Sequence, residues 1–194
     1  MAGHPDFLRL ETERLTIRFP MPEDAKEAHA AIHESWPELH RWMDWAKDLP
    51  TLEECERVAR ERQVARAGDV IREIPFGLFL KGTATLVGRS DIHNIDWSVP
   101  RCEIGYWVRS RFARQGYVTE AVAAITTYAF DVLGARRVEI RCDVRNARSA
   151  GVPRRLGFVH EATLKDDRRH PRTGELSDTL VFAKTRAEAG GRDG

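Results

Sequence analysis

The stretch from Arg109 to Glu120 contains the clearest candidate for a ligand site in this sequence. Gly116 permits a tight turn, and we expect consecutive N–H groups from about Gln115 to Thr119 to point outward at the positive N-terminus of a helix. Three arginines flank this turn, so the loop suits an anion. Simple capping of the helix is the alternative, because neither a Walker sequence nor a GxGxxG motif specifies a phosphate ligand.

The strand expected just before this loop carries a candidate general base, Glu103. Alternation along the strand predicts one face made of Glu103, Gly105 and Trp107, and a core face made of Cys102, Ile104, Tyr106 and Val108. A carboxylate beside a glycine, which leaves space, can take a proton from an ammonium directly or through water. An α-amine has a pKa of about 7.7 to 8.0, so a weak base suffices. The alternative is a carboxylate that binds the amine or pairs with an arginine.

Two further polar groups lie where a helix is expected to begin. Ser149 follows Asn146 by three residues, so both side chains can face one cleft, although Asn and Ser at a helix start are also ordinary caps. His93 ends a predicted strand and is either a second base or a satisfied edge residue.

The segment from Trp36 to Trp45 concentrates aromatic and acidic side chains. It holds three tryptophans, and amphipathic aromatic rings with carboxylates suit a peptide-like or cationic amine. A helix that covers the core through Trp42 and Trp45 is the alternative interpretation.

Periodicity and turn signals predict the elements that position these groups. Strands are expected at Arg14–Phe19, Ile74–Leu80, Thr85–His93, Cys102–Arg109, Val138–Cys142, Val159–Leu164 and Leu176–Lys184. Helices are expected from Met21 to about Ser35, from the capping box of Thr51 and Glu54 to about Gly68, at Thr119–Leu133 before Gly134, and at about Arg148–Leu156. This order predicts an α/β (α+β mixed) fold with helices on the faces of a mixed sheet. Residues 1–186 are expected to form one domain and residues 187–194 a disordered tail.

Length and charge exclude several classes of protein. The 194 residues carry 31 basic and 30 acidic side chains, and this balance argues against a nucleic-acid binder. Residues 1–100 carry a net charge of −5, whereas residues 101–172 carry +7, which suits a cation in the first part and an anion in the second. There is no apolar run long enough to span a membrane, and the N-terminus lacks a signal-peptide pattern. We therefore expect a cytoplasmic protein, with no membrane partner.

The three cysteines carry no sign of a metal or disulfide framework. Cys55, Cys102 and Cys142 are odd in number, widely spaced and without a CxxC motif, so they are interpreted as small buried hydrophobes and no metal site is expected.

Four motifs in order resemble the GNAT acyl-CoA-dependent N-acyltransferases, and among them the RimJ/RimL-like group. They are Glu103-Ile-Gly-Tyr-Trp-Val108, Gln115-Gly-Tyr-Val-Thr-Glu-Ala121, Asn146-Ala-Arg-Ser149 and Leu156-Gly-Phe158. The resemblance covers roughly Leu10 to Lys184. It implies a GNAT-like twisted mixed sheet of about seven strands, splayed between the fourth and fifth strands, flanked by about four helices, with acetyl-CoA in the gap.

The resemblance also implies roles for individual residues. It assigns the pantetheine arm to backbone groups of Trp107, Val108 and Arg109 and to Asn146, and the pyrophosphate to Arg114, Gln115, Gly116, Tyr117, Val118 and Thr119. It places Ser149 at the thiol of CoA and Trp36, Trp42 and His93 on the acceptor side. Two positions depart from the family's pyrophosphate motif. Ala113 stands where Gln or Arg is usual, and Val118 stands where a small residue is usual. Backbone donors do not require those side chains, so the departures affect loop geometry and affinity.

These observations favour direct acetyl transfer from acetyl-CoA to an amine. In this hypothesis the acceptor is a primary amine of a peptide, a protein N-terminus or a small molecule, Glu103 assists deprotonation, and Ser149 assists thiolate departure. A non-catalytic acyl-CoA-binding regulatory module is the rival, and a nucleic-acid-binding protein is a weaker one. The resemblance does not settle the acceptor, the acyl group or the oligomeric state, for which a homodimer is one arrangement.

Overall fold

A computed structural model of the chain describes residues 9–66 and 73–190. The strands are β1 (Arg9–Glu11), β2 (Leu15–Arg18), β3 (Ile74–Leu80), β4 (Leu86–Asp96), β5 (Arg101–Val108), β6 (Arg137–Asp143), β7 (Val159–Arg169) and β8 (Leu176–Thr185). The helices are α1 (Ala25–Glu34), α2 (Trp36–Trp42), α3 (Leu52–Arg66), α4 (Tyr117–Asp131) and α5 (Ala147–Arg155), with short 3₁₀ turns η1 (Pro22–Asp24) and η2 (Ser110–Phe112).

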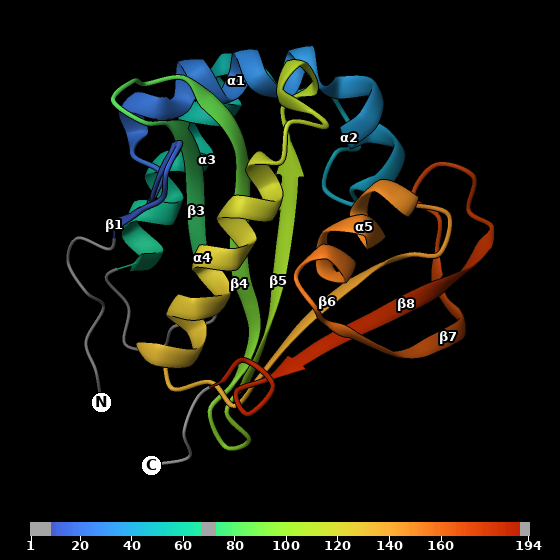
Figure 1. Cartoon of the computed structure of the whole chain (residues 1–194). Helices are drawn as coiled ribbons and strands as arrows, with labels where there is room; N and C mark the ends of the chain where they lie inside the picture. The colour runs from blue at the N-terminus through green and yellow to red at the C-terminus, as the bar shows by residue number, and fades with distance from the viewer. Residues whose placement is uncertain (1–8, 67–72, 191–194) are drawn as a thin grey trace.

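The strands form one mixed sheet in the order β1-β2-β3-β4-β5-β6-β8-β7. All neighbours are antiparallel except β5 and β6, which pair in parallel over three residues only, from Arg101 opposite Arg137 to Glu103 opposite Glu139. Beyond this point the two strands diverge, and the sheet opens into two wings (Figure 1). The predicted mixed sheet, splayed between the fourth and fifth expected strands, is thus confirmed.

The structure contains two elements, β1 and α2, that are absent from the expected strands and helices. Strand β1 is three residues long, too short for alternation to reveal it in the sequence. Helix α2 covers Trp36–Trp42, so the helix of the alternative interpretation is present. It packs on the core through Leu39 and Trp36 rather than through Trp42 and Trp45, and Trp45 lies beyond the helix and is 52% exposed. The expected end of the second helix near Gly68 lies outside the described residues. Ala187–Gly190 continue as a turn, and residues 191–194 of the expected tail are also outside the described part.

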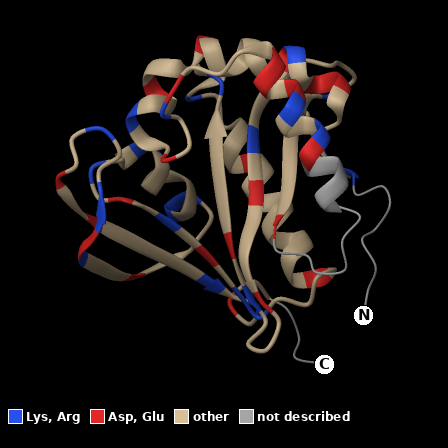
Figure 2. Ribbon diagram, turned by 180° about the vertical axis from the view of Figure 1, so that it is seen from behind, with Lys and Arg blue, Asp and Glu red and all other residues tan. Residues whose placement is uncertain are grey.

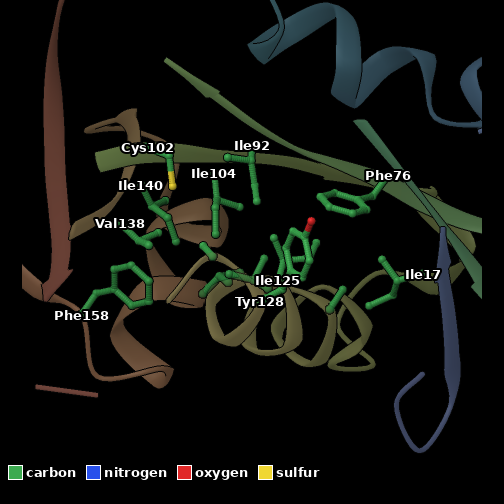
Figure 3. Close-up of a cluster of buried hydrophobic side chains, with 14 of the residues drawn as sticks. Ile17, Phe76, Ile92, Cys102, Ile104, Ile125, Tyr128, Val138, Ile140 and Phe158 are labelled. Carbon is green, nitrogen blue, oxygen red and sulfur yellow. The ribbon is translucent and has the colours of Figure 1, made fainter. Parts of the chain in front are cut away.

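Helices cover both faces of the larger wing. On one face, α4 packs its apolar side against Ile17, Phe76, Ile92 and Ile104, and the same buried cluster continues to Val138, Ile140 and Phe158 (Figure 3). On the other face, α1 and α2 bury Ala28, Ala31, Ile32 and Leu39 against Phe79, Leu86 and Trp107. Alternation on β5 is therefore as predicted, because Cys102 and Ile104 belong to the first cluster and Trp107 to the second.

Local signals at the ends of α4 explain its position. Gly116 precedes the helix with a left-handed φ of 84°, and Gly134 follows it at 73°, as the glycine signals predict. The helix begins at Tyr117, two residues before the expected Thr119. Its N-terminus thereby follows immediately on the turn after β5.

A buried arginine joins the turn after β5 to α1. The Arg109 side chain is only 5% exposed, and its Nη1 and Nε each donate at 2.7 Å to Glu27 and Glu34 respectively. Both carboxylates belong to α1. This charge cluster therefore fixes α1 over the end of β5.

Charged residues of both signs are interleaved over the wings rather than separated by sequence half (Figure 2). The net charges of −5 and +7 along the chain therefore do not correspond to two charged faces. Among the described residues, no helix combines the length and apolarity needed to cross a membrane.

We predict that Arg109→Met destabilises the fold by about 2 to 3 kcal/mol, because it removes the buried cation between Glu27 and Glu34 and leaves Glu34 only the more exposed Arg111. Arg57→Ala is the control, since Arg57 pairs with Glu61 at 2.7 Å on the surface of α3, and a loss of about 0.5 kcal/mol is expected there. Urea denaturation measures both free energies of unfolding. Equal losses would contradict a structural role for the buried cluster.

Candidate active site

The divergence of β5 and β6 creates a cavity of about 170 Å³ between the wings. β5 contributes one wall, β6 and the start of α5 the opposite wall, and the end of α2 the roof. Its lining comprises Trp42, Met43, His93, Glu103, Ile104, Gly105, Tyr106, Arg141, Cys142, Asp143, Asn146, Ser149 and Arg168. The structure thus brings together five of the residues singled out in the sequence, namely Trp42, His93, Glu103, Asn146 and Ser149.

Glu103 lies in this cavity with both carboxylate oxygens held. His93 Nε2 lies 3.4 Å from Glu103 Oε1, and Asn94 Nδ2 donates to Oε2 at 3.1 Å. Arg141 Nε approaches Oε2 at 3.7 Å from β6. The Glu103 side chain is 16% exposed, so it is a partly desolvated carboxylate of defined orientation.

A second carboxylate, Asp91, holds the other side of the His93 ring. Asp91 Oδ1 lies 3.1 Å from His93 Nδ1 and accepts the N–H of Gly105 at 3.1 Å. A Cβ at Gly105 would lie 2.5 Å from this oxygen, a distance that real Cβ atoms do not show. Gly105 therefore leaves space for Asp91, whereas the sequence analysis attributed the space to Glu103.

The two carboxylates determine the protonation of His93. Its hydrogen bond to Asp91, followed by that to Glu103, raises the pKa of His93 from 6.5 to about 10 against the opposing effect of burial. The ring is therefore an imidazolium at neutral pH. An imidazolium has no lone pair for a further proton, so in this arrangement the ring is a hydrogen-bond donor to two carboxylates rather than a base.

Ser149 is held by two neighbours at the start of α5. Asn146 Oδ1 accepts the N–H of Ser149 at 3.1 Å, so Asn146 is a helix cap as well as a lining residue. Tyr106 Oη donates to the carbonyl oxygen of Ser149 at 2.9 Å, and Ser149 Oγ donates to Tyr106 Oη at 3.3 Å. The Ser149 hydroxyl thereby has a defined direction inside the cavity.

Tyr106 is a functional candidate that the alternation rule assigned only to the core. Burial raises the pKa of its hydroxyl, against the weaker opposing effect of Ser149. The phenol therefore stays protonated and acts as a hydrogen-bond donor at neutral pH. The available signal was its hydroxyl, because a buried tyrosine usually has a polar partner.

The cysteines are not activated nucleophiles. Cys142 lines the cavity, but burial raises the pKa of its thiol, and burial raises that of Cys102 to about 12. Cys55 is half-buried and its pKa is also raised by burial. All three are free thiols, and Cys102 and Cys142 are buried as predicted.

The turn before α4 presents the predicted anion site at some distance from the cavity lining. The first-turn N–H groups of Tyr117, Val118 and Thr119 have no partners inside the helix. Arg114 and Gly116 both adopt left-handed φ, of 64° and 84°, and are exposed. Consecutive donors at the end of a 15-residue helix can therefore meet an anion from solvent.

Side chains around this turn brace it. Arg14 pairs with Glu120 at 2.6 Å and donates to the carbonyl oxygen of Gln115 at 3.0 Å. Arg155 of α5 donates to Thr119 Oγ1 at 3.2 and 3.3 Å. The guanidinium of Arg155 thus lies beside the first turn of α4. This contact connects the predicted anion site to α5, which belongs to the smaller wing.

The free edge of β5 differs from the expected one. The N–H of Arg109 donates to Val87 O on β4 at 2.8 Å. Backbone groups of successive residues face opposite edges, so those of Trp107 also face β4. The groups of Tyr106 and Val108 face β6, and no strand in the described part of the chain pairs with them there.

This geometry corrects two of the expected pantetheine contacts. Arg109 has no group left for a ligand, because its side chain binds α1 and its carbonyl oxygen accepts the N–H of Phe112 at 2.9 Å. The Trp107 side chain is buried in the second core cluster. Of the three expected backbone positions, only Val108 therefore presents groups to the unpaired edge, and Tyr106 presents its groups there as well.

The acceptor-side residues are divided between two environments. Trp42 lines the cavity with its ring edge against His170, at a centroid distance of 5.8 Å. Trp36 is not among the lining residues and packs against the second core cluster. Arg168 lines the cavity and pairs with Asp44 at 3.1 Å, which joins β7 to the segment after α2.

Comparison with known proteins agrees with this geometry. The family model described as the acetyltransferase (GNAT) domain matches residues 14–159. YdaF of Bacillus subtilis, whose name assigns it to ribosomal N-acetylation, is 32% identical over 154 residues, covering 79% of this chain and 82% of YdaF. The N-acetyltransferase p20 of Bacillus licheniformis, which has no characterised activity, is 27% identical over 94% of this chain and 98% of its own.

A solved structure shares the fold. RimL, a ribosomal L7/L12 alpha-N-protein acetyltransferase in complex with coenzyme A, superposes with a TM-score of 0.81. The alignment covers 92% of this chain and 98% of RimL at 20% identity.

We predict that His93 titrates near pH 10 in the folded protein. His29 is expected to titrate below 6.5, because burial and the neighbouring His33 both lower its pKa. NMR of the labelled histidine rings measures both values. Because the folded state binds the His93 proton more tightly than the unfolded state, its contribution to stability is full below about pH 6.5. It is lost as the pH rises through about 10. A His93 ring that titrates near 6.5 would contradict the double carboxylate contact.

Proposed function

The chain belongs to the GNAT acetyltransferase family and is an N-acetyltransferase, and on this premise we propose that it acetylates the N-terminal amine of a peptide or protein. A small-molecule amine is the other acceptor class. The observation that carries the proposal is the shared cavity, in which Glu103 lies on β5 and Ser149 on α5. Relatives named for ribosomal N-acetylation and for ribosomal-protein-serine acetylation favour a protein acceptor.

The donor in this proposal is acetyl-CoA, which supplies a thioester carbonyl and a thiolate leaving group. The first-turn N–H groups of Tyr117, Val118 and Thr119 are suited to its pyrophosphate. The outward groups of Tyr106 and Val108 are suited to the amides of pantetheine, which would lie along β5 as an added strand. Arg155 beside Thr119 supplies positive charge to the phosphates.

The acceptor amine enters as an ammonium or as the neutral amine. Glu103 takes a proton from the ammonium, directly or through water, and so frees the nitrogen lone pair. The α-amine pKa of about 7.7 to 8.0 makes this transfer easy near neutral pH. His93 does not compete for the proton, because it already carries one.

Transfer then occurs directly between the two substrates. The amine nitrogen forms a bond to the acetyl carbon, and a backbone N–H on the outer edge of β5 stabilises the oxyanion. The C–S bond breaks as the carbonyl re-forms, and the nitrogen loses its extra proton to Glu103, which has by then passed the proton of the ammonium to solvent. Ser149 turns its one hydroxyl proton from Tyr106 Oη to the departing thiolate, whose low thiol pKa of about 8.5 makes it a good leaving group. The raised thiol pKa of Cys142 is the reason to prefer direct transfer over an acyl-cysteine.

We also place the protein in the cytoplasm. Its three free thiols, two of them buried, suit a reducing compartment.

Incubation with acetyl-CoA and a panel of peptides and polyamines tests the function. We expect thiol release and a mass increase of one acetyl group on peptides with a free N-terminus, and none on the same peptides with a blocked N-terminus. Glu103→Gln is expected to lower the rate at saturating acceptor by about 100-fold near pH 7. Glu161→Gln, which removes a more exposed carboxylate on β7, serves as the control and is expected to keep the rate. CoA binding without turnover on any acceptor would instead support the regulatory module.

The anion site is tested by two matched glycine variants at opposite ends of α4. Gly116→Ala and Gly134→Ala both place a Cβ on a left-handed residue, so each is expected to cost about 1 to 2 kcal/mol of stability. Only Gly116→Ala disturbs the proposed phosphate donors, and we expect it to weaken CoA binding about tenfold, or about 1.4 kcal/mol. Calorimetry measures the affinities. Equal effects of both variants on CoA affinity would refute the assigned position of the phosphates.

A further inference from the structure

Three charged side chains form a line across β4 and β5 beside the cavity. The strand register places His93 directly opposite Glu103, and Asp91 directly opposite Gly105. His93 Nδ1 contacts Asp91 at 3.1 Å and His93 Nε2 contacts Glu103 at 3.4 Å. The imidazolium therefore joins the two carboxylates in a fixed order, Asp91–His93–Glu103.

The backbone keeps Asp91 in this position. Its Oδ1 accepts both the His93 ring N–H and the N–H of Gly105, at 3.1 Å each. A Cβ at position 105 would lie 2.5 Å from this oxygen, so any residue other than glycine there displaces the Asp91 carboxylate. A carboxylate fixed by a strand amide is a rigid anchor for the histidine ring.

The other charged groups around the cavity have their own partners. Arg141 of β6 approaches Glu103 at 3.7 Å but donates to Glu139 Oε2 at 2.8 Å. Burial alone would raise the pKa of Asp143, but hydrogen bonds from Arg145 and Ser177 lower it to about 2.

From β7, Arg168 pairs with Asp44. Arg141, Asp143 and Arg168 complete the charged lining besides His93 and Glu103. The two ring nitrogens of His93 contact the carboxylates of Asp91 and Glu103, so these two groups set the charge of the ring.

We propose that Asp91 and His93 are positioning residues for Glu103, the base of the proposed function on which this inference rests. Asp91 keeps the His93 ring charged and oriented, and the ring in turn holds Oε1 of Glu103. Asn94 holds Oε2. The Glu103 carboxylate is thereby held in one rotamer that faces the acceptor amine. A base on a freely rotating side chain would have to reach this rotamer again in each catalytic cycle.

The closing experiment follows the pH dependence of the rate in Asp91→Asn. Asparagine keeps an oxygen for the Gly105 N–H but lacks the charge, so the pKa of His93 should fall from about 10 toward its ordinary value. Above that lower pKa the neutral ring keeps only one N–H. When this proton lies on Nδ1, toward the oxygen at position 91, Nε2 has no proton to donate to Glu103. We expect the ratio of the variant to the wild-type rate at saturating acceptor to fall about tenfold between pH 6.5 and 9. NMR of His93 in the same variant reports the change in pKa independently of activity.

Two further variants make the result specific. His93→Gln supplies an amide N–H that does not titrate, so the double variant Asp91→Asn/His93→Gln is expected to restore a constant ratio across this pH range. Asp96→Asn is the control, because it removes a carboxylate at the end of the same strand. Asp96 accepts the backbone N–H groups of Ser98 and Val99 and does not contact His93, so the ratio of this variant's rate to the wild-type rate should stay constant.

The outcomes separate this inference from the proposed function. If Glu103→Gln loses activity while Asp91→Asn lowers the rate equally at every pH, Glu103 is the base and the positioning role is wrong. If Glu103→Gln keeps full activity, the base assignment fails and the positioning role fails with it. A His93 pKa that stays near 10 in Asp91→Asn would overturn the proposed anchor whatever the activity.

Discussion

The parting of β5 from β6 is the constraint on which the rest of the site depends. The strands pair only as far as Glu103 and Glu139, so the following edge of β5 has no strand partner in the described chain. Backbone donors and acceptors that leave water need partners, and this edge is therefore disposed to take an extended ligand with amide groups. The same divergence opens the cavity, so Glu103 and Ser149, which come from different wings, face a single space.

The site works only if both wings are rigid. In the larger wing, α4 is held to the sheet by aliphatic packing, and Arg109 fixes α1 over the end of β5 by binding two of its carboxylates. The groups proposed to act on the amine lie on paired strands rather than on loops, and strands hold side chains within narrower limits. The anion site belongs to a helix end that Arg14 and Arg155 brace from two directions.

Much of this arrangement could be predicted from local patterns. Alternation on β5 assigned Cys102 and Ile104 to one face and Trp107 to the other, and Gly116 and Gly134 marked the ends of α4. The failures share a cause. Arg109 resembled one more cation beside the loop, but its partners lie 75 and 82 residues earlier in the chain. No pattern in the neighbouring sequence indicates such a contact.

The sequence by itself determined where most of the strands, helices and tight turns form, β1 excepted, because alternation, capping and left-handed glycines depend on residues a few positions apart. It also determined which side chains were chemically suited to a base or a hydrogen-bond donor. Only the tertiary structure decided what each polar group touches. The register of β4 on β5 sets Asp91 over Gly105 and His93 against Glu103, and the packing of α5 brings Ser149 to Tyr106. Since a titratable group's protonation and direction are set by its neighbours, these contacts turned candidate residues into an arranged site.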